Sequence, residues 1–254
     1  MIQLIKNSEL DNEKIPKILT PIQDHDSFDF SKIVVNKPWG YEYLMYSNDD
    51  VAIWILHIKK DCLTSMHCHL NKKTILIVLS GEAICATLNQ GFNLRKGDGL
   101  IIDKKVFHST QAISEEGIII MEIETPVKKT DLLRLIDYYG RETKEYESKN
   151  EMTKELENYN YATFEKNEFG VIKKIGNMNL CIEKFYNDAE IKNYLISKDD
   201  EIIIILNGRI EDEKGQSFEI ADIFEKKRIK NLNNLIIKKP LEILKIKNIK
   251  QNDF

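Results

Sequence analysis

The chain of 254 residues is long enough for one large domain or two domains of ordinary size. Its hydrophobic share of 42% and charged share of 31% are typical of a globular protein, and a formal net charge of −4 gives no reason to expect nucleic acid or a membrane as a partner. The first residues, MIQLIKNSELDNEKIPK, lack the apolar core of a signal peptide, and no uncharged apolar run is long enough to span a membrane. We therefore expect a cytoplasmic protein.

The first half of the chain has the pattern of an all-β domain. Residues 1–35 are weakly patterned, and we expect them to form a short helix or strand packed on the outside. From residue 41 onward, short apolar and β-branched runs recur between Gly, Asn and Asp, which is typical of a sandwich or barrel. These runs are VAIWILHI (51–58), TILIVLSG (74–81), AICATL (83–88), GLIID (99–103), VFHSTQAI (106–113) and GIIIMEIE (117–124).

The pattern changes over residues 128–160 and then returns. Apolar residues at Leu132, Leu133, Leu135 and Ile136 have a helix-like rhythm and precede a highly charged stretch, which predicts a connecting helix and linker. Strand-like runs resume in residues 161–254. They are LCIEKFY (180–186), EIIIILNG (201–208), SFEIADIF (217–224), NLIIKK (234–239) and LEILKIKN (241–248).

The second half repeats the first. TILIVLSGEAICATL (74–88) resembles EIIIILNGRIEDEKG (201–215), and GFNLRKGDGLIIDKK (91–105) resembles GQSFEIADIFEKK (215–227). An internal duplication of one β-barrel unit is the simplest explanation.

The four cysteines are expected to be free thiols. Cys62, Cys68, Cys85 and Cys181 have no CxxC spacing, and nothing in the sequence indicates secretion. Cys68 alternates with two histidines and should point away from them.

Three histidines form a candidate metal site. In SMHCHLNKKTILIVLSG, His67 and His69 are two residues apart, so a strand would place both on one face. A third, His108, follows the turn-rich segment KGDGLIIDKK at the head of a strand. Three neutral imidazoles can hold one divalent transition metal, such as Zn, Fe, Mn or Ni, and leave positions open for water and substrate.

The spacing of these histidines resembles the two metal motifs of the cupin superfamily. The order is H-x-H, a strand that ends at Gly81, then G-D-G and His108. The flanks NKPWGYEYL and DLLRLIDYYGRE are similar to those of type II mannose-6-phosphate isomerase-like cupins, so the resemblance covers roughly residues 36–142. It implies two double-stranded β-helix (jelly-roll) barrels in a homodimer. We expect a metal-binding barrel over residues 36–127, the helical linker over 128–160, and a degenerate second barrel without histidines over 161–254.

The motif departs from the family where its metal-binding glutamate would lie. Thr74 occupies that position, seven residues before Gly81, and Lys72-x-Thr74 replaces the arginine-x-glutamate pair of the isomerase-like members. Asp103 and Lys105 replace the proline and glycine of the second motif. A site without this carboxylate carries one more positive charge, which favours an anionic ligand or a lower pKa for a metal-bound water.

Six further residues are candidates for roles at the site. Glu122 lies on one face of IIIMEIE and could be a general base, and His57 could point toward the metal from the preceding strand, although a core position explains it as well. Lys72 and Arg141 could bind an anionic group, and Thr74 could hydrogen-bond a metal-bound water. Tyr41 could line the mouth of the barrel or pack against its end.

Three functions are compatible with these residues. The first is a metal-dependent isomerase or epimerase of carbohydrate or surface-glycan metabolism that acts on a sugar phosphate or sugar nucleotide. The second is a three-histidine non-haem iron dioxygenase, which the missing glutamate favours. The third is a non-catalytic sugar-binding cupin, which suits the absence of histidines after His108. The flanking segments favour the first.

Overall fold

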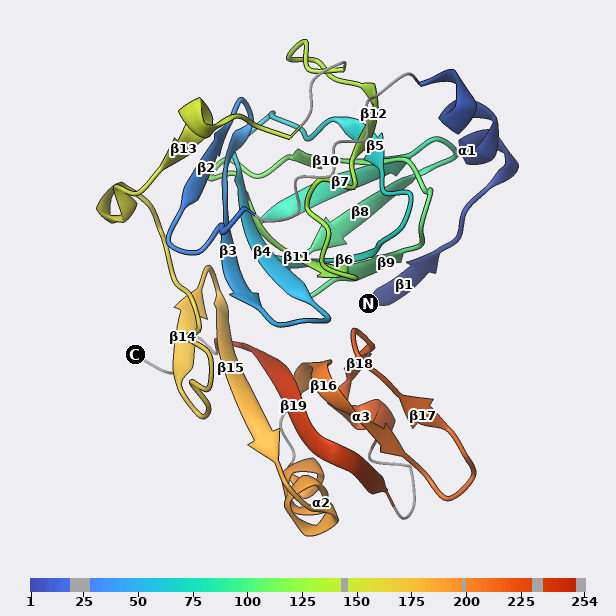
Figure 1. Cartoon of the computed structure of the whole chain (residues 1–254), viewed down its shortest axis with the longest axis vertical. Coiled ribbons are helices and arrows are strands. Elements are labelled where there is room, and N and C mark those ends of the chain that lie inside the picture. The colour runs from blue at the N-terminus through green and yellow to red at the C-terminus, as the bar shows by residue number, and fades with distance from the viewer. Residues whose placement is uncertain (19–27, 143–145, 198–199, 230–234, 250–254) are drawn as a thin grey trace. The chain divides into compact units, whose positions relative to one another are not determined.

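The computed structural model divides the chain into two compact units. It describes residues 1–18, 28–142, 146–197, 200–229 and 235–249. Unit 1 comprises Met1–Ser47 and Ala52–Thr163, and unit 2 comprises Asn48–Val51 and Phe164–Phe254 (Figure 1). No helix in these described ranges has both the length and the apolar character needed to cross a membrane.

Eight consecutive strands of unit 1 form a jelly-roll barrel. One sheet contains the order β9-β6-β11-β4 and the facing sheet contains β5-β10-β7-β8, so the strands alternate between sheets as two Greek keys require. The expected all-β, cupin-type fold is therefore confirmed. The eight strands are β4 (Ala52–Ile58), β5 (Met66–Cys68), β6 (Lys73–Ser80), β7 (Glu82–Thr87), β8 (Gly91–Arg95), β9 (Gly99–Ile102), β10 (His108–Ala112) and β11 (Ile118–Thr125).

The remaining elements of unit 1 extend these two sheets. Strand β1 (Ile2–Ile5) pairs in parallel with β9, and helix α1 (Glu9–Lys14) follows it, capped by the Ser8 side chain. The 3-10 helix η1 (Ile15–Lys17) continues α1. On the other edge of the first sheet, β3 (Gly40–Ser47), β2 (Val34–Lys37) and β13 (Met152–Thr153) follow β4 in that order.

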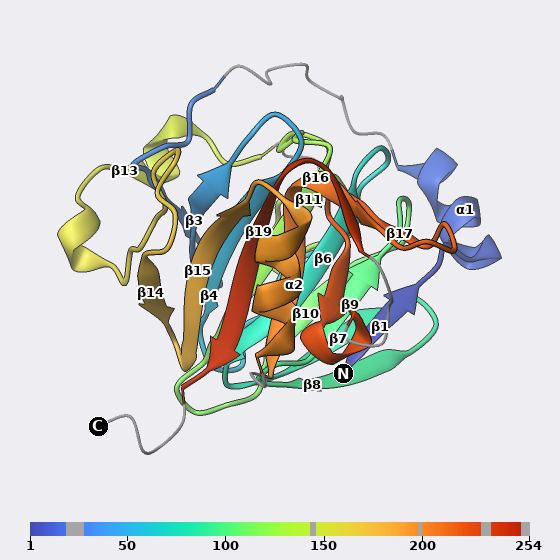
Figure 2. The same cartoon turned by 90° about the horizontal axis from the view of Figure 1, so that it is seen from below.

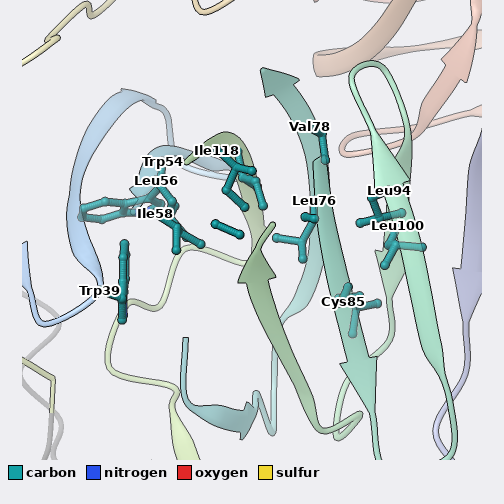
Figure 3. Close-up of a cluster of buried hydrophobic side chains, with 14 of the residues drawn as sticks. Trp39, Trp54, Leu56, Ile58, Leu76, Val78, Cys85, Leu94, Leu100 and Ile118 are labelled. Carbon is teal, nitrogen blue, oxygen red and sulfur yellow. The ribbon is translucent and has the colours of Figure 1, made fainter. Parts of the chain in front are cut away.

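The barrel core lies between the two sheets. Strands β4, β6 and β11 turn alternate residues toward the facing sheet, so Leu56 and Ile58 meet Leu76 and Val78 in one buried cluster (Figure 3). Trp39 and Trp54 close one side of this cluster, with exposed fractions of 4% and 2%. Trp39, Leu56 and Leu76 of this cluster also line the cavity that contains the histidines, so the apolar core supports the site directly.

The segment 128–160 is not a helical linker. It contains β12 (Leu133–Ile136), η2 (Lys149–Glu151), β13 and η3 (Leu156–Asn158), with no α-helix among its described residues. Leu133 pairs with Cys68 across β12 and β5, so the apolar residues that suggested a helix extend the second sheet instead. Pairing with the exposed edge of β5 satisfies the backbone, which overrides the helical rhythm.

The described part of unit 2 contains a six-stranded antiparallel sheet and two helices. Helix α2 (Asp188–Ile196) begins at the cap Asn187, whose side chain accepts a hydrogen bond from the Glu190 amide, and α3 covers Lys226–Ile229. The strands are β14 (Ile172–Ile175), β15 (Met178–Phe185), β16 (Glu201–Glu211), β17 (Ser217–Phe218), β18 (Ile223–Glu225) and β19 (Ile236–Asn248), in the order β14-β15-β19-β16, with β17 and β18 both paired to β16.

This sheet repeats the first sheet of unit 1. The order β14-β15-β19-β16-β18 matches β3-β4-β11-β6-β9 when strands are taken in chain order. The turn before β9 also matches the turn before β18. The amide of Val78 donates to the Asp98 carbonyl at 3.0 Å, and the amide of Ile205 donates to the Asp222 carbonyl at 3.1 Å. The two segments whose sequences resemble each other therefore occupy equivalent places, as a duplication requires.

The expected second barrel is only half present. In the described part of unit 2 there is one sheet, and no second sheet faces it. Helix α2 follows β15 and precedes β16, and Figure 2 shows it beside β19 of the same sheet. At this point of the chain unit 1 has β5, between β4 and β6. Ile191 and Leu195 of α2 pack with Ile203 and Ile243 of the sheet. The helix buries the apolar face that a second sheet would otherwise cover.

Candidate metal centre

Three histidines meet inside the barrel of unit 1. His67 is in β5, His69 follows that strand, and His108 begins β10 directly opposite His67. One ring nitrogen from each lies within 4.8 Å of the others. Cys68 points to the opposite face and packs with Phe107, as the alternation predicts. The residues that the sequence proposed as metal ligands are thus brought together.

Each imidazole is held by a main-chain carbonyl. Nδ1 of His67 lies 2.8 Å from the Ser65 oxygen, Nδ1 of His69 lies 2.5 Å from the Asp131 oxygen, and Nδ1 of His108 lies 3.0 Å from the Val106 oxygen. A carbonyl only accepts, so each Nδ1 carries the hydrogen and each Nε2 keeps its lone pair. This arrangement fixes the tautomer that metal ligation requires.

The histidines are neutral and available to a metal. Burial lowers the pKa of His67 and His69 well below the usual value and that of His108 to about 4, because a charged imidazole would lose its hydration. Nε2 of His69 is buried and has no hydrogen-bond partner among the described residues. A buried unpartnered lone pair beside two others fits a divalent transition metal, which would supply Lewis-acid polarisation of a bound oxygen.

Glu122 is the carboxylate nearest to these ring nitrogens. It lies on β11 between Leu76 and Trp54 of the neighbouring strands, and its Oε1 is 4.0 Å from Nε2 of His69. Burial raises its pKa to about 7, with Lys129 opposing and Glu124 adding to that shift. The sequence proposed Glu122 as a base, and the structure brings it into the cavity with the histidines.

Thr74 is buried and is not among the residues that line the cavity of the histidines. Its side chain is 1% exposed, and its Oγ1 has no hydrogen-bond partner within the described residues. It lies directly opposite Glu124 across β6 and β11. The place of the family's glutamate is therefore taken by a hydroxyl beside the carboxylate of another strand.

The histidines open into a small cavity of about 60 Å³ with charged walls. Five cationic side chains line it, and so do four carboxylates. The cations are Lys37, Lys72, Lys129, Arg134 and Arg141, and the carboxylates are Glu42, Glu122, Glu124 and Glu147. The total is unusual for a buried space, where an ion is stable only when it is paired.

A chain of ion pairs crosses one wall of the cavity. Lys72 lies 2.7 Å from Glu124, Lys129 lies 3.6 Å from Glu124 and 3.1 Å from Glu42, and Lys37 lies 3.3 Å from Glu42. Burial alone would raise the pKa of Glu42, but Lys129 and Lys37 outweigh it and lower the pKa to about 2. Glu42 is therefore ionised in the folded state.

A second group of ion pairs continues from the first, because Lys37 also pairs with Glu147. Arg141 is 2.9 Å from Asp137 and 2.5 Å from Glu147, and Arg134 is 3.7 Å from Glu147. Arg134 also lies beside His67 in the register of β12 and β5. Lys72 and Arg141, which we expected to bind an anion, do line the cavity, but both are already paired with carboxylates.

Two further candidates, besides Thr74, lie outside the cavity. His57 stands between Leu56 and Ile58, which face the barrel core, so its side chain lies on the other face of the sheet. There it stacks on Tyr41 with ring centres 4.3 Å apart. Burial lowers the pKa of His57 to about 4, as for a neutral packed residue. The structure thus agrees with the alternative in which His57 is a packed residue, and Tyr41 packs against it and is not among the residues that line the cavity.

Sequence reasoning missed Asp131, which fastens the loop after the histidine pair. Its carboxylate accepts hydrogen bonds from the amides of Leu70, Asn71 and Lys72, and its carbonyl accepts from His69. It also missed Lys37, Glu42 and Arg134. All four lie within the segments NKPWGYEYL and DLLRLIDYYGRE, which the sequence had matched to family flanks, so their charged residues were the available signal.

No protein-family model and no curated protein sequence matches this chain. Solved structures similar to it include KdgF from Halomonas sp., with 15% identity, a TM-score of 0.35, and coverage of 36% of this chain and 83% of that one. A cupin-2 domain protein from Shewanella frigidimarina has 23% identity and a TM-score of 0.31 over 35% and 83%. A sugar phosphate isomerase of the cupin superfamily from Silicibacter pomeroyi has 9% identity and a TM-score of 0.34 over 41% and 74%.

The strand order and the site define the fold class without these likenesses. Unit 1 is an eight-stranded, cupin-type jelly roll with three histidines inside, which form the one candidate transition-metal site found among the described residues.

Proposed function

We propose that unit 1 is a metal-dependent isomerase or epimerase that acts on a phosphorylated or nucleotide-linked sugar. The observation that carries the proposal is the position of Glu122, whose carboxylate lies 4.0 Å from the free Nε2 of His69 within a buried cavity. A metal held by the three histidines would polarise a carbonyl or hydroxyl oxygen. A base beside that oxygen can then move a proton on the adjacent carbon.

The residues of the chain have distinct parts in this reaction. Glu122 removes a proton from the carbon next to the carbonyl group and returns it to the neighbouring carbon, while the hydroxyl hydrogen moves to the former carbonyl oxygen. Lys72 and Arg134 line the cavity and orient the oxygens of the substrate. The apolar core around Trp39 and Leu76 excludes bulk water, which strengthens these electrostatic contacts.

The test is proton exchange in deuterated water. Protein loaded separately with Zn, Mn, Fe or Ni is incubated with aldoses, ketoses, their phosphates and nucleotide-linked sugars, and proton NMR follows loss of the signal at the carbon beside the carbonyl. We expect exchange with at least one sugar. Glu122→Gln should lower the rate about 100-fold or more and retain the metal, whereas His69→Ala should lose both. Exchange that survives in Glu122→Gln would refute its role as the base.

A three-histidine dioxygenase is the second candidate. The observation that favours it is Thr74, which leaves the histidines without a carboxylate from the expected position. An oxygen electrode distinguishes the two functions, because oxygen uptake by the iron-loaded protein without proton exchange would support the dioxygenase. Saturable sugar binding with neither reaction would instead support a non-catalytic binding module.

We also propose a cytoplasmic homodimer. All four cysteines are free, as expected, and free thiols suit a reducing compartment. Sedimentation equilibrium of the full chain tests the dimer, which a mass of 29.7 kDa in solution would exclude.

A further inference from the structure

We infer that the cavity accepts the uncharged, hydroxyl-bearing end of its ligand and that any phosphate stays outside. The inference rests on the proposed function for its choice of sugars, but it concerns binding and not turnover. The proposed subsite consists of Glu124 and Lys72 in the cavity wall, next to the three histidines, and Thr74 lies directly behind it in the strand register, opposite Glu124.

The first argument is the charge of the cavity. In the described part of the chain, each of the five lining cations has a carboxylate oxygen within 4.0 Å. The carboxylates that pair with them are Glu42, Glu124, Glu147 and Asp137, and Glu122 is a further carboxylate in the cavity wall. Four carboxylates thus line the cavity with the five cations, and Asp137, outside the cavity wall, pairs with Arg141. A phosphate would therefore have to compete with a carboxylate for each of these cations.

The second argument is an unpartnered acceptor. Lys72 and Lys129 both approach Oε1 of Glu124, at 2.7 and 3.6 Å. Oε2 of the same carboxylate is buried and has no hydrogen-bond partner among the described residues. Such an oxygen needs a donor. A sugar hydroxyl provides one, whereas a phosphate dianion brings only acceptors and a second negative charge.

The third argument is the neighbour of that acceptor. Thr74 lies opposite Glu124 in the strand register, and its Oγ1 likewise has no partner within the described ranges. The Lys72 ammonium can donate further hydrogen bonds, since Glu124 is the one carboxylate within ion-pair distance of it among the described residues. The cavity wall therefore offers a donor, Lys72, beside an acceptor, Glu124, which matches hydroxyl groups on adjacent carbons.

The size of the cavity agrees with this ligand. About 60 Å³ holds roughly four to six water molecules. A few hydroxylated carbons fit such a space, and a nucleotide does not.

The experiment measures binding selectivity by isothermal titration calorimetry on the zinc-loaded full chain. The probes are D-mannose, D-fructose, D-xylose, D-erythrose, the 6-phosphates of mannose and fructose, and inorganic phosphate. We expect at least one free sugar to bind, each 6-phosphate to bind within about threefold of its parent sugar, and inorganic phosphate not to compete. Phosphates that bind tenfold tighter, competition by inorganic phosphate, or no binding of any free sugar would overturn the inference.

Variants assign the binding to the subsite. Glu124→Gln should weaken sugar binding at least tenfold with unchanged zinc content, and Thr74→Val should weaken it about threefold. The matched control is Glu201→Gln in unit 2, which alters another buried glutamate–lysine pair, with Lys226 at 3.4 Å, and should leave the affinity unchanged. Thermal unfolding checks that each variant is folded.

Failure of this inference and failure of the proposed function are distinguishable. Equal binding of sugars and their phosphates without proton exchange would keep the subsite and remove the isomerase. Proton exchange combined with a strong preference for phosphates would keep the isomerase and remove the subsite.

Discussion

Unit 1 and unit 2 each contain a sheet with the same strand order, but the inner face of that sheet is covered differently in each. In unit 1 a second sheet covers it and encloses a charged cavity. That second sheet carries His67 and His108, and His69 lies in the loop after β5. Unit 2 uses helix α2, and its core cluster is apolar. The comparison shows that the shared sheet is a scaffold and that the candidate chemistry depends on what faces it.

Equivalent positions have diverged in opposite directions. Glu201 of unit 2 corresponds to Thr74 of unit 1, since each lies seven residues before the glycine of its turn. The carboxylate of Glu201 accepts a hydrogen bond from Tyr194 at 2.6 Å and pairs with Lys226, so it serves the core. Unit 1 has the histidines without this glutamate, and unit 2 has the glutamate without histidines.

The largest effect should come from removing a histidine. His108→Ala should reduce bound metal from about one equivalent to none, because loss of a ligand costs more than the 10- to 100-fold typical of an outer contact. Glu201→Ala should leave the metal content unchanged. Elemental analysis of dialysed protein measures both. Metal retained by His108→Ala, or lost from Glu201→Ala, would contradict the assignment of the site to unit 1.

The two cores should respond differently to the same truncation. Leu76 and Ile203 are equivalent, because they precede by two residues Val78 and Ile205, whose amides bond the matching turns. Leu76 borders the cavity, whereas Ile203 is packed in an apolar cluster. We expect Ile203→Ala to cost about 4 kcal/mol of unfolding free energy and Leu76→Ala about 2 kcal/mol, because the space left by Leu76 joins a cavity that water can fill. Native-state hydrogen exchange of β16 and β6 measures each cost in its own unit. Equal costs would contradict this difference.

Acid should destabilise unit 1 through Glu42. Its folded pKa of about 2 lies below the usual value of 4.5, so its contribution is complete above pH 4.5 and is lost as the pH falls toward 2. The loss is on the order of 3 kcal/mol at most. Glu42→Gln should flatten the decline between pH 5 and 3, measured by hydrogen exchange of β3. An unchanged slope would show that other carboxylates control acid unfolding.

The smallest effect concerns the turn that both units share. Gly97 has φ of +85°, and Ala221 occupies the equivalent place with φ of +61°. An alanine in this left-handed region is strained, so Ala221→Gly should stabilise unit 2 by about 0.5–1 kcal/mol. Gly97→Ala should destabilise unit 1 by a similar amount. Urea denaturation followed by circular dichroism measures both, and stabilisation by Gly97→Ala would contradict the equivalence.

The sequence predicted the scaffold and the histidines because both depend on local spacing. Strand-length apolar runs between turns predict β-structure, and an H-x-H pair on a strand must share a face. The position of His108 follows from the turn before its strand. Repeated segments on either side of Gly81 and Gly208 likewise predicted the duplication.

Other features depend on contacts that spacing does not reveal. VAIWILHI is apolar on both faces, so alternation could not tell which face His57 would join. The charged wall joins Lys37, Glu42 and Lys129, which are close only after the barrel closes. The apolar residues near Leu133 have a helical rhythm, but the unpaired edge of β5 converts them to a strand.

The two tryptophans give the protein a natural optical reporter. The chain has only Trp39 and Trp54, and both belong to unit 1. Trp39 lines the cavity, and the Lys129 ammonium lies 3.7 Å from the centre of the Trp54 ring. Tryptophan fluorescence therefore reports on unit 1 alone. A ligand that moves Lys129 will change the emission directly, while unit 2 can unfold without its own tryptophan signal.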